Sequence, residues 1–91
     1  MNGSVELIFL RLARPDIALV KFIFESYEGV AVVRTLDKRA AVIVVMVSRD
    51  FFEVARGILD SLRETVELEE IAPPDNLDEE WLLSFVRSDE V

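Results

Sequence analysis

Two segments of the chain are apolar on both faces when they are written as extended strands, Val5–Leu12 and Ala40–Val47. Side chains in a strand point alternately to opposite faces, so a strand with one face in water should alternate apolar and polar residues. In the first segment this alternation sorts six apolar side chains into two sets, Ile8, Leu10 and Leu12 on one face and Val5, Leu7 and Phe9 on the other. Both segments therefore predict central strands that protein covers on both sides.

Two further segments have the period of an amphipathic helix. The first starts at Pro15, which suits a first helical turn, and Gly29 suits the position after its end. The second follows Ser48 or Asp50, either of which can cap a helix. The expected apolar stripes are Ile17, Val20, Phe24 and Tyr27, widened by Leu19, Phe22 and Ile23, in the first helix, and Phe51, Val54, Ala55, Ile58 and Leu62 in the second.

Gly57 interrupts the second helix at a cost of about 1 kcal/mol relative to alanine. Either the helix tolerates this glycine at that cost, or another backbone approaches closely at this point. The charged residues of this helix are spaced so that opposite charges three or four residues apart can pair. They are Arg49, Glu53, Arg56, Asp60 and Arg63.

The remaining strands complete a βαββαβ order. Val30–Thr35 is rich in β-branched residues, Leu36–Arg39 is the expected hairpin connection, and Val66–Ile71 makes a last strand. Right-handed crossovers fold this order into an α+β, ferredoxin-like two-layer sandwich, in which two helices cover one face of the sheet. The two doubly apolar segments are the ones that this topology places in the centre.

The chain divides into a ferredoxin-like domain over residues 1–72 and a tail over residues 73–91, which begins with a Pro-Pro hinge. In the tail Leu77, Trp81 and Phe85 recur every four residues, which predicts an added, acidic C-terminal amphipathic helix. Isolated helices of this length are marginal in water, so this helix needs a surface on which to dock. Trp81 is either a binding hot spot or a cover for the core of this chain or of a sister subunit.

Charge argues against nucleic acid as a partner. The net charge is −8, and it comes entirely from the last 27 residues, since nine basic and nine acidic residues balance in the first 64. An acidic chain is repelled by phosphate backbones. The expected third strand, Ala40–Val47, also lacks the aromatic side chains on which RNA-recognition domains stack bases.

The chain contains no cysteine and no histidine. Disulfides, thiolate or imidazole metal sites and Cys–His or Ser–His nucleophiles are therefore excluded. The three glycines lie too far apart for a phosphate-binding loop. We expect no enzymatic activity, no catalytic residue, no cofactor and no metal.

Two sets of charged residues, the C-terminal carboxylates and Arg14, allow more than one interpretation. Glu67, Glu69 and Glu70 are expected to protect a strand edge. Asp75, Asp78, Glu79 and Glu80 are either linker and helix-start charge or a divalent-ion site, although EF-hand spacing is absent. Arg14, in the loop after the first strand, either binds an anion at the start of the helix or is a solvated loop residue. No membrane partner is expected, because no apolar run reaches the roughly 18 residues of a membrane span. The absence of cysteine fits a cytoplasmic location.

Two stretches, Arg14–Leu19 and Gly29–Thr35, resemble ACT-type regulatory domains, which carry a Pro-Gly step before the first helix and then a β-rich continuation. The stretches Glu25–Gly29 and Thr35–Asp37 more closely resemble a small uncharacterised family of stand-alone bacterial domains with no assigned activity. The resemblance covers roughly residues 10–71.

ACT domains typically dimerise and hold small ligands, often amino acids, near the loop before the first helix. The resemblance therefore implies a small-molecule-sensing alternative with the ligand near Arg14, Pro15, Asp16 and Ile17. Asp16 stands where ACT domains have the glycine that lets a ligand approach the backbone.

The main expectation is a non-enzymatic module that associates with itself as a homodimer or a higher oligomer, or with another protein. Two helices cannot cover both faces of the sheet, and monomers rarely expose large apolar patches. The expected contact residues are Val5, Leu7, Phe9, Val42, Val44 and Met46 on the sheet, with Trp81, Leu82 and Phe85 of the tail helix sealing the contact in cis or crossing to the partner.

Overall fold

The computed structural model describes residues 5–74; residues 1–4 and 75–91 are not described. Four strands and two helices alternate in the expected βαββαβ order, and a short 3-10 turn precedes each helix. The elements are β1 (Val5–Leu12), η1 (Arg14–Asp16), α1 (Ile17–Glu25), β2 (Ala31–Asp37), β3 (Val42–Ser48), η2 (Arg49–Phe51), α2 (Phe52–Leu62) and β4 (Leu68–Ile71).

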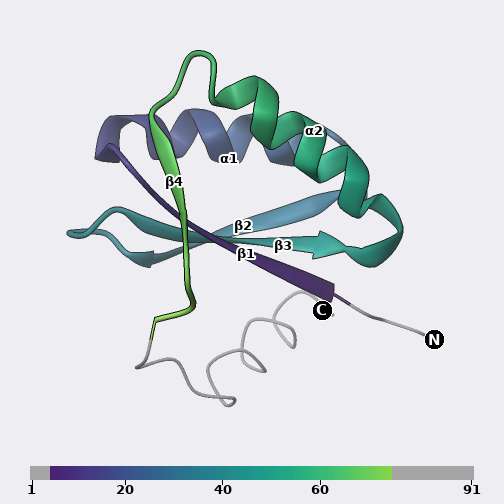
Figure 1. The fold of residues 1–91 in the computed structure, drawn as a ribbon, viewed down its shortest axis with the longest axis horizontal. Helices are drawn as coiled ribbons and strands as arrows, with labels where there is room; N and C mark the ends of the chain where they lie inside the picture. Colours follow the sequence, from purple (N-terminus) through teal and green to yellow (C-terminus); the bar gives the residue numbers. More distant parts are fainter. Residues whose placement is uncertain (1–4, 75–91) are drawn as a thin grey trace.

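The strands form one antiparallel sheet in the order β2-β3-β1-β4, and both helices lie on the same side of it (Figure 1). The central pair, β1 and β3, is in register from Val5 opposite Ser48 to Arg11 opposite Val42. This α+β arrangement confirms the predicted element order and the central strands, and it is compatible with a ferredoxin-like fold. The predicted C-terminal helix and most of the predicted tail lie outside the described residues.

The main core lies between the sheet and the two helices. Leu10 and Ile43 of the central strands and Phe24 and Leu59 of the helices are fully buried there. Each such side chain contributes roughly 1.5–3 kcal/mol through removal from water. In β3 every residue from Val42 to Val47 is buried, so neither face of this strand meets water. This agrees with its apolar residues on both faces.

The apolar stripe predicted for α1 is wider than the face that the structure buries. Val20 and Phe24 are fully buried, whereas Leu19 is exposed and Phe22 is 70% exposed. The helix also ends at Glu25, short of Tyr27, which is exposed in the turn that follows. A helix on one side of a sheet buries only the positions that point at the sheet, and Leu19 and Phe22 do not.

The prediction for α2 needs two corrections. Neither Ser48 nor Asp50 makes a capping hydrogen bond to α2, because η2 intervenes and Phe51 occupies the cap position. The buried face includes Leu59, which the predicted stripe omitted, while Phe51 and Val54 are exposed. Leu59 packs in the core between the helices and the sheet.

Two turns require a left-handed backbone. Gly29, before β2, has φ +81°, a conformation that costs a side-chain-bearing residue about 1–2 kcal/mol. In the β2–β3 hairpin Ala41 has φ +58°, and the Asp37 carboxylate accepts a hydrogen bond from the Ala40 N–H at 3.0 Å. This local bond closes the turn that follows β2.

The two described glycines give opposite predictions. Gly29→Ala should lower the free energy of unfolding by about 1 kcal/mol because of its positive φ. Gly57→Ala should raise it by roughly 0.5–1 kcal/mol, because alanine favours the helix and a Cβ there meets no atom within 4 Å. Denaturant unfolding of both variants measures these shifts. Destabilisation by Gly57→Ala would instead support close approach of another backbone.

Candidate functional site

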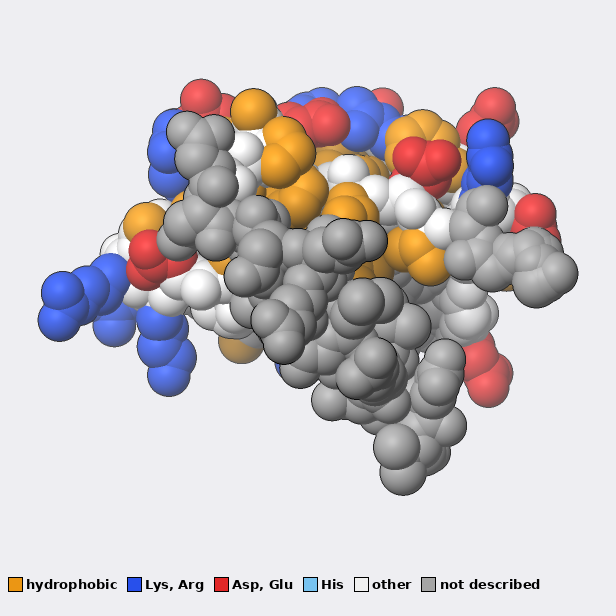
Figure 2. Space-filling model, turned by 90° about the horizontal axis from the view of Figure 1, so that it is seen from below, with side chains coloured by type: hydrophobic (Ala, Val, Ile, Leu, Met, Phe, Trp, Pro, Cys, Tyr) orange, Lys and Arg blue, Asp and Glu red, His pale blue; other side chains and the backbone are white. Residues whose placement is uncertain are grey.

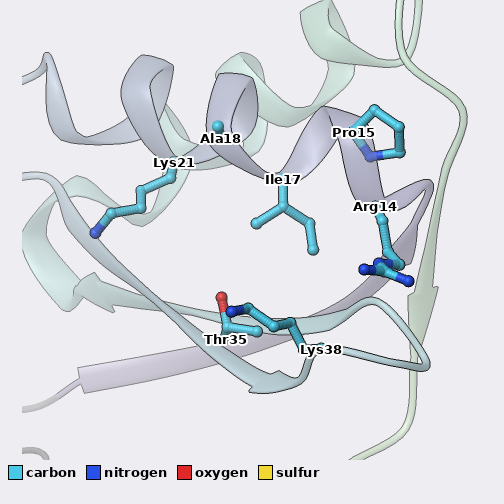
Figure 3. Close-up of a pocket in the computed structure, with 7 residues that line it drawn as sticks. All are labelled: Arg14, Pro15, Ile17, Ala18, Lys21, Thr35 and Lys38. Atoms are coloured by element: carbon cyan, nitrogen blue, oxygen red, sulfur yellow. The ribbon is translucent and has the colours of Figure 1, made fainter.

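A hollow of about 750 Å³ opens between the start of α1 and the β2–β3 hairpin (Figure 3). We call it the basic hollow. Three elements contribute to it, namely η1, α1 and the end of β2 with the hairpin turn. Its lining residues are Arg14, Pro15, Ile17, Ala18, Lys21, Thr35 and Lys38.

Local structure sets the positions of these side chains. Pro15 suits the first turn of η1, which the Asp16 N–H closes by donating to the Ala13 carbonyl at 2.9 Å. Ile17 and Lys21 lie one helical turn apart and therefore on the same side of α1. In Figure 3 Ile17 points from the helix into the hollow, and Lys38 reaches from the hairpin beneath it towards Thr35.

The charge of the basic hollow is positive. Lys21 shares its charge with Glu25, whose carboxylate lies 3.3 Å away and also accepts the Val33 N–H at 3.0 Å. Within residues 5–74 neither Arg14 nor Lys38 has a carboxylate partner, and no acidic residue lines the hollow. Two exposed cations thus face the hollow with their charges unneutralised by the described part of the chain.

A second candidate surface is the sheet face opposite both helices. Phe9, Val44 and Met46 form its buried centre, and partly buried apolar side chains from β1, β2 and β4 pack around them. Pairing aligns Leu7 with Met46 and Val32 in one row and Ile71 with Phe9 and Val44 in the next. We call the set the open sheet face: Leu7, Phe9, Val32, Leu36, Val44, Met46 and Ile71.

In Figure 2, which views the molecule from this side, the visible hydrophobic side chains lie inside a margin of charged ones. One charged pair lies on the same face, where Arg11 and Glu69 meet at 2.9 Å across β1 and β4. An apolar centre with a charged margin is the usual anatomy of a protein–protein contact.

The carboxylates of β4 are held by arginines. Glu70 lies 3.0 Å from Arg56 and 3.7 Å from Arg63, both of α2, and Glu69 pairs with Arg11. These ion pairs link the edge strand to its neighbour and to α2. Among residues 5–74 the structure places no group of three or more metal-ligating side chains together.

Comparison with known families identifies one relative. The model of a family described as Domain of unknown function (DUF4911) matches residues 10–66, which is more than half of the chain. The chain belongs to this family. No curated protein and no solved structure matches it.

The family match confirms the predicted resemblance to an uncharacterised family of unknown activity. It contains the whole basic hollow and all of the open sheet face except Leu7, Phe9 and Ile71. The bacterial origin and the similarity to ACT domains stay predictions. In the part of this DUF4911 chain that the structure describes, neither helix has the length and apolar character needed to cross a bilayer.

Three of the four predicted ligand residues line the basic hollow of this DUF4911 domain: Arg14, Pro15 and Ile17. Asp16 is half-buried but does not line it. Sequence reasoning missed Lys21, Thr35 and Lys38. Lys21 could have been found from its spacing of four residues after Ile17, and the hairpin residues could be placed only once the helix was packed over β2.

Most of the predicted sheet contact residues lie on the open sheet face. Leu7, Phe9, Val44 and Met46 belong to the open sheet face, and Val42 is buried on the same side of β3 by alternation. Val5 is 50% exposed at the start of β1, and its part in a contact stays a prediction. Trp81, Leu82 and Phe85 lie outside the described residues. The face members that sequence reasoning missed are Val32, Leu36 and Ile71 of the edge strands.

Glu70→Gln should lower the free energy of unfolding by roughly 0.5–1 kcal/mol at low ionic strength, because Arg56 and Arg63 lose a charged partner. The loss should shrink in high salt, which screens exposed ion pairs. Glu67→Gln is the matched control, since no partner of Glu67 is found within residues 5–74. Equal effects of the two variants in denaturant unfolding would contradict a role for the Glu70 pairs.

Proposed function

We propose that this domain is a non-enzymatic association module that binds a second copy of itself through the open sheet face. The observation that carries the proposal is the continuity of this apolar surface across all four strands, on the side of the sheet opposite both helices. A sheet in a small two-layer domain normally puts polar residues on the side away from its helices. Here the centre of that side carries phenylalanine, methionine, leucine, isoleucine and valine, and Arg11 and Glu69 lie beside them.

The free energy available from such a contact is adequate for association. Removing apolar surface from water contributes about 25 cal/mol per Å², so covering several hundred Å² gives several kcal/mol before the cost of association. A two-fold dimer places the same face of each copy against the other and hides both at once. The Arg11–Glu69 pair would then lie at the margin, where charges can stay solvated.

The tail belongs to the same proposal on the evidence of the sequence. The proposed contribution of Trp81, Leu82 and Phe85 rests on their amphipathic pattern. Pro74, the last described residue, follows β4 closely, and Ile71 of β4 is part of the open sheet face. In this proposal residues 75–91, which continue the chain from Pro74, cover this face or the partner's.

Sedimentation of the full-length chain at micromolar concentration tests the proposal. The unaltered protein should sediment as a dimer or a larger oligomer. The double variant Leu7→Lys with Val32→Lys should shift it to monomer, because both side chains lie on the open sheet face and are only partly buried. Two like charges brought into an apolar contact oppose association.

Phe22→Lys is the matched control, because Phe22 is 70% exposed on α1, on the opposite side of the sheet. It should leave the oligomer intact, and circular dichroism checks that every variant is folded. A monomeric unaltered protein, or an oligomer that Phe22→Lys disrupts and the double variant does not, would contradict the proposal.

A second candidate function is a small-molecule-sensing regulatory domain. The observation that favours it is that the basic hollow lies at Arg14, Pro15 and Ile17, near which the resemblance to ACT domains implies a ligand. The volume of the hollow lies in the range of small-molecule sites.

A thermal-shift screen of small metabolites against the full-length chain tests this second function. A ligand that binds only the folded protein must raise the melting temperature, by an amount that grows with its concentration over its dissociation constant. The screen should return at least one such ligand at millimolar concentration, and Ile17→Asp should abolish its effect. No shift with any compound would count against ligand sensing but would leave self-association unaffected.

A further inference from the structure

We infer that the basic hollow binds a small organic anion that has an apolar body and carries no ammonium group. The anionic group would lie between Arg14 and Lys38, and the apolar body against Ile17. This inference rests on the second candidate function and names the chemistry of its ligand. It is independent of self-association through the open sheet face.

The positive charge of the hollow has a local origin. Three elements each supply one cation: η1 supplies Arg14, α1, which follows it directly, supplies Lys21, and the hairpin, further along the chain, supplies Lys38. The chain as a whole carries a net charge of −8. A positive hollow in such a chain comes from the local placement of these three residues and not from a general excess of basic residues.

The side chains of the described lining do not suit a zwitterion. The ammonium group of a free amino acid needs a carboxylate or a carbonyl acceptor to replace water. Among residues 5–74 no carboxylate lines the hollow, and the Glu25 carboxylate is already engaged by Lys21 and the Val33 N–H. Of the described lining side chains, Thr35 alone is an uncharged acceptor. A ligand ammonium would therefore meet cationic side chains instead of carboxylates.

Part of the lining of the basic hollow is apolar. Pro15, Ile17 and Ala18 present carbon atoms to the hollow, and Ile17 points into it (Figure 3). A simple inorganic ion would use the cations but leave this surface in water. An organic anion with an aliphatic body would use both, because each buried methylene adds about 0.8 kcal/mol.

Three matched probes separate these contributions. The first is 4-methylpentanoate. The second is leucine, which adds an ammonium group to the same skeleton, and the third is 3-methylbutylamine, which keeps the alkyl skeleton but carries only the ammonium group. Each is titrated into the full-length, ¹⁵N-labelled protein at low salt. The carboxylate should shift amide signals of Ile17, Lys21 and Lys38 at millimolar concentration. Leucine should bind roughly fivefold more weakly or worse, and the amine should cause no shift there.

Charge-removing variants test the residues. Arg14→Gln and Lys38→Gln should each weaken binding of 4-methylpentanoate by roughly two- to fivefold. Arg39→Gln is the matched control, because Arg39 follows Lys38 in the same hairpin, is exposed and does not line the hollow. It should leave the affinity unchanged, and added salt should weaken binding to the unaltered protein.

Three results would overturn the inference. If leucine binds at these residues as tightly as 4-methylpentanoate, the hollow is a ligand site but the exclusion of an ammonium group is wrong, and the second candidate function survives. If Arg39→Gln weakens binding as much as Lys38→Gln, the effect is general attraction and the assigned site is wrong. If no probe shifts these amides while the screen finds a ligand elsewhere, the hollow is not the sensing site.

Discussion

The structure depends on one constraint: its two central strands carry apolar side chains on both faces, while its two helices cover only one. Leu10 and Ile43 meet the helices, and Phe9 and Val44 point the other way with exposures of 4% and 0%. Dry surroundings on both sides of β1 and β3 are thus as much a part of this fold as the helix-side core. The proposed dimer would cover the members of the open sheet face that are only partly buried in the single chain, Leu7, Val32, Leu36 and Ile71.

The two candidate surfaces lie on opposite sides of the sheet but share one hairpin. Strand alternation sends Leu36 to the open sheet face, while Thr35, one residue earlier, and Lys38 in the turn line the basic hollow. The hairpin is held by local features, the Asp37 side chain on the Ala40 N–H and the left-handed Ala41. A short, closed turn therefore presents both surfaces from one rigid connection.

Sequence patterns predicted the element order and the central strands, because both depend on local composition, whereas the ligand position near Arg14–Ile17 was implied only by the resemblance to ACT domains. Alternation in Val5–Leu12 and Ala40–Val47 was sufficient to identify β1 and β3, and Pro15 marked the loop before α1. The rotation of each helix about its axis was not predictable, since it depends on packing against the sheet. For that reason Leu59 was missed and Leu19 and Phe22 were assigned to a covered side. Lys38 and Thr35 could not be assigned to the hollow because their approach to Ile17 is a tertiary contact.

Mixed-label NMR tests the central claim most directly, because it asks what lies over the open sheet face. The chain has only two methionines, and Met46 is at the centre of that face, so a ¹³C-methyl methionine label isolates one informative signal. In an equal mixture of labelled and unlabelled full-length protein, the account predicts filtered NOEs from the Met46 methyl group to protons of the unlabelled copy. NOEs confined to its own chain, at concentrations where dimers should form, would contradict it and would assign residues 75–91 or solvent as the neighbour of this face.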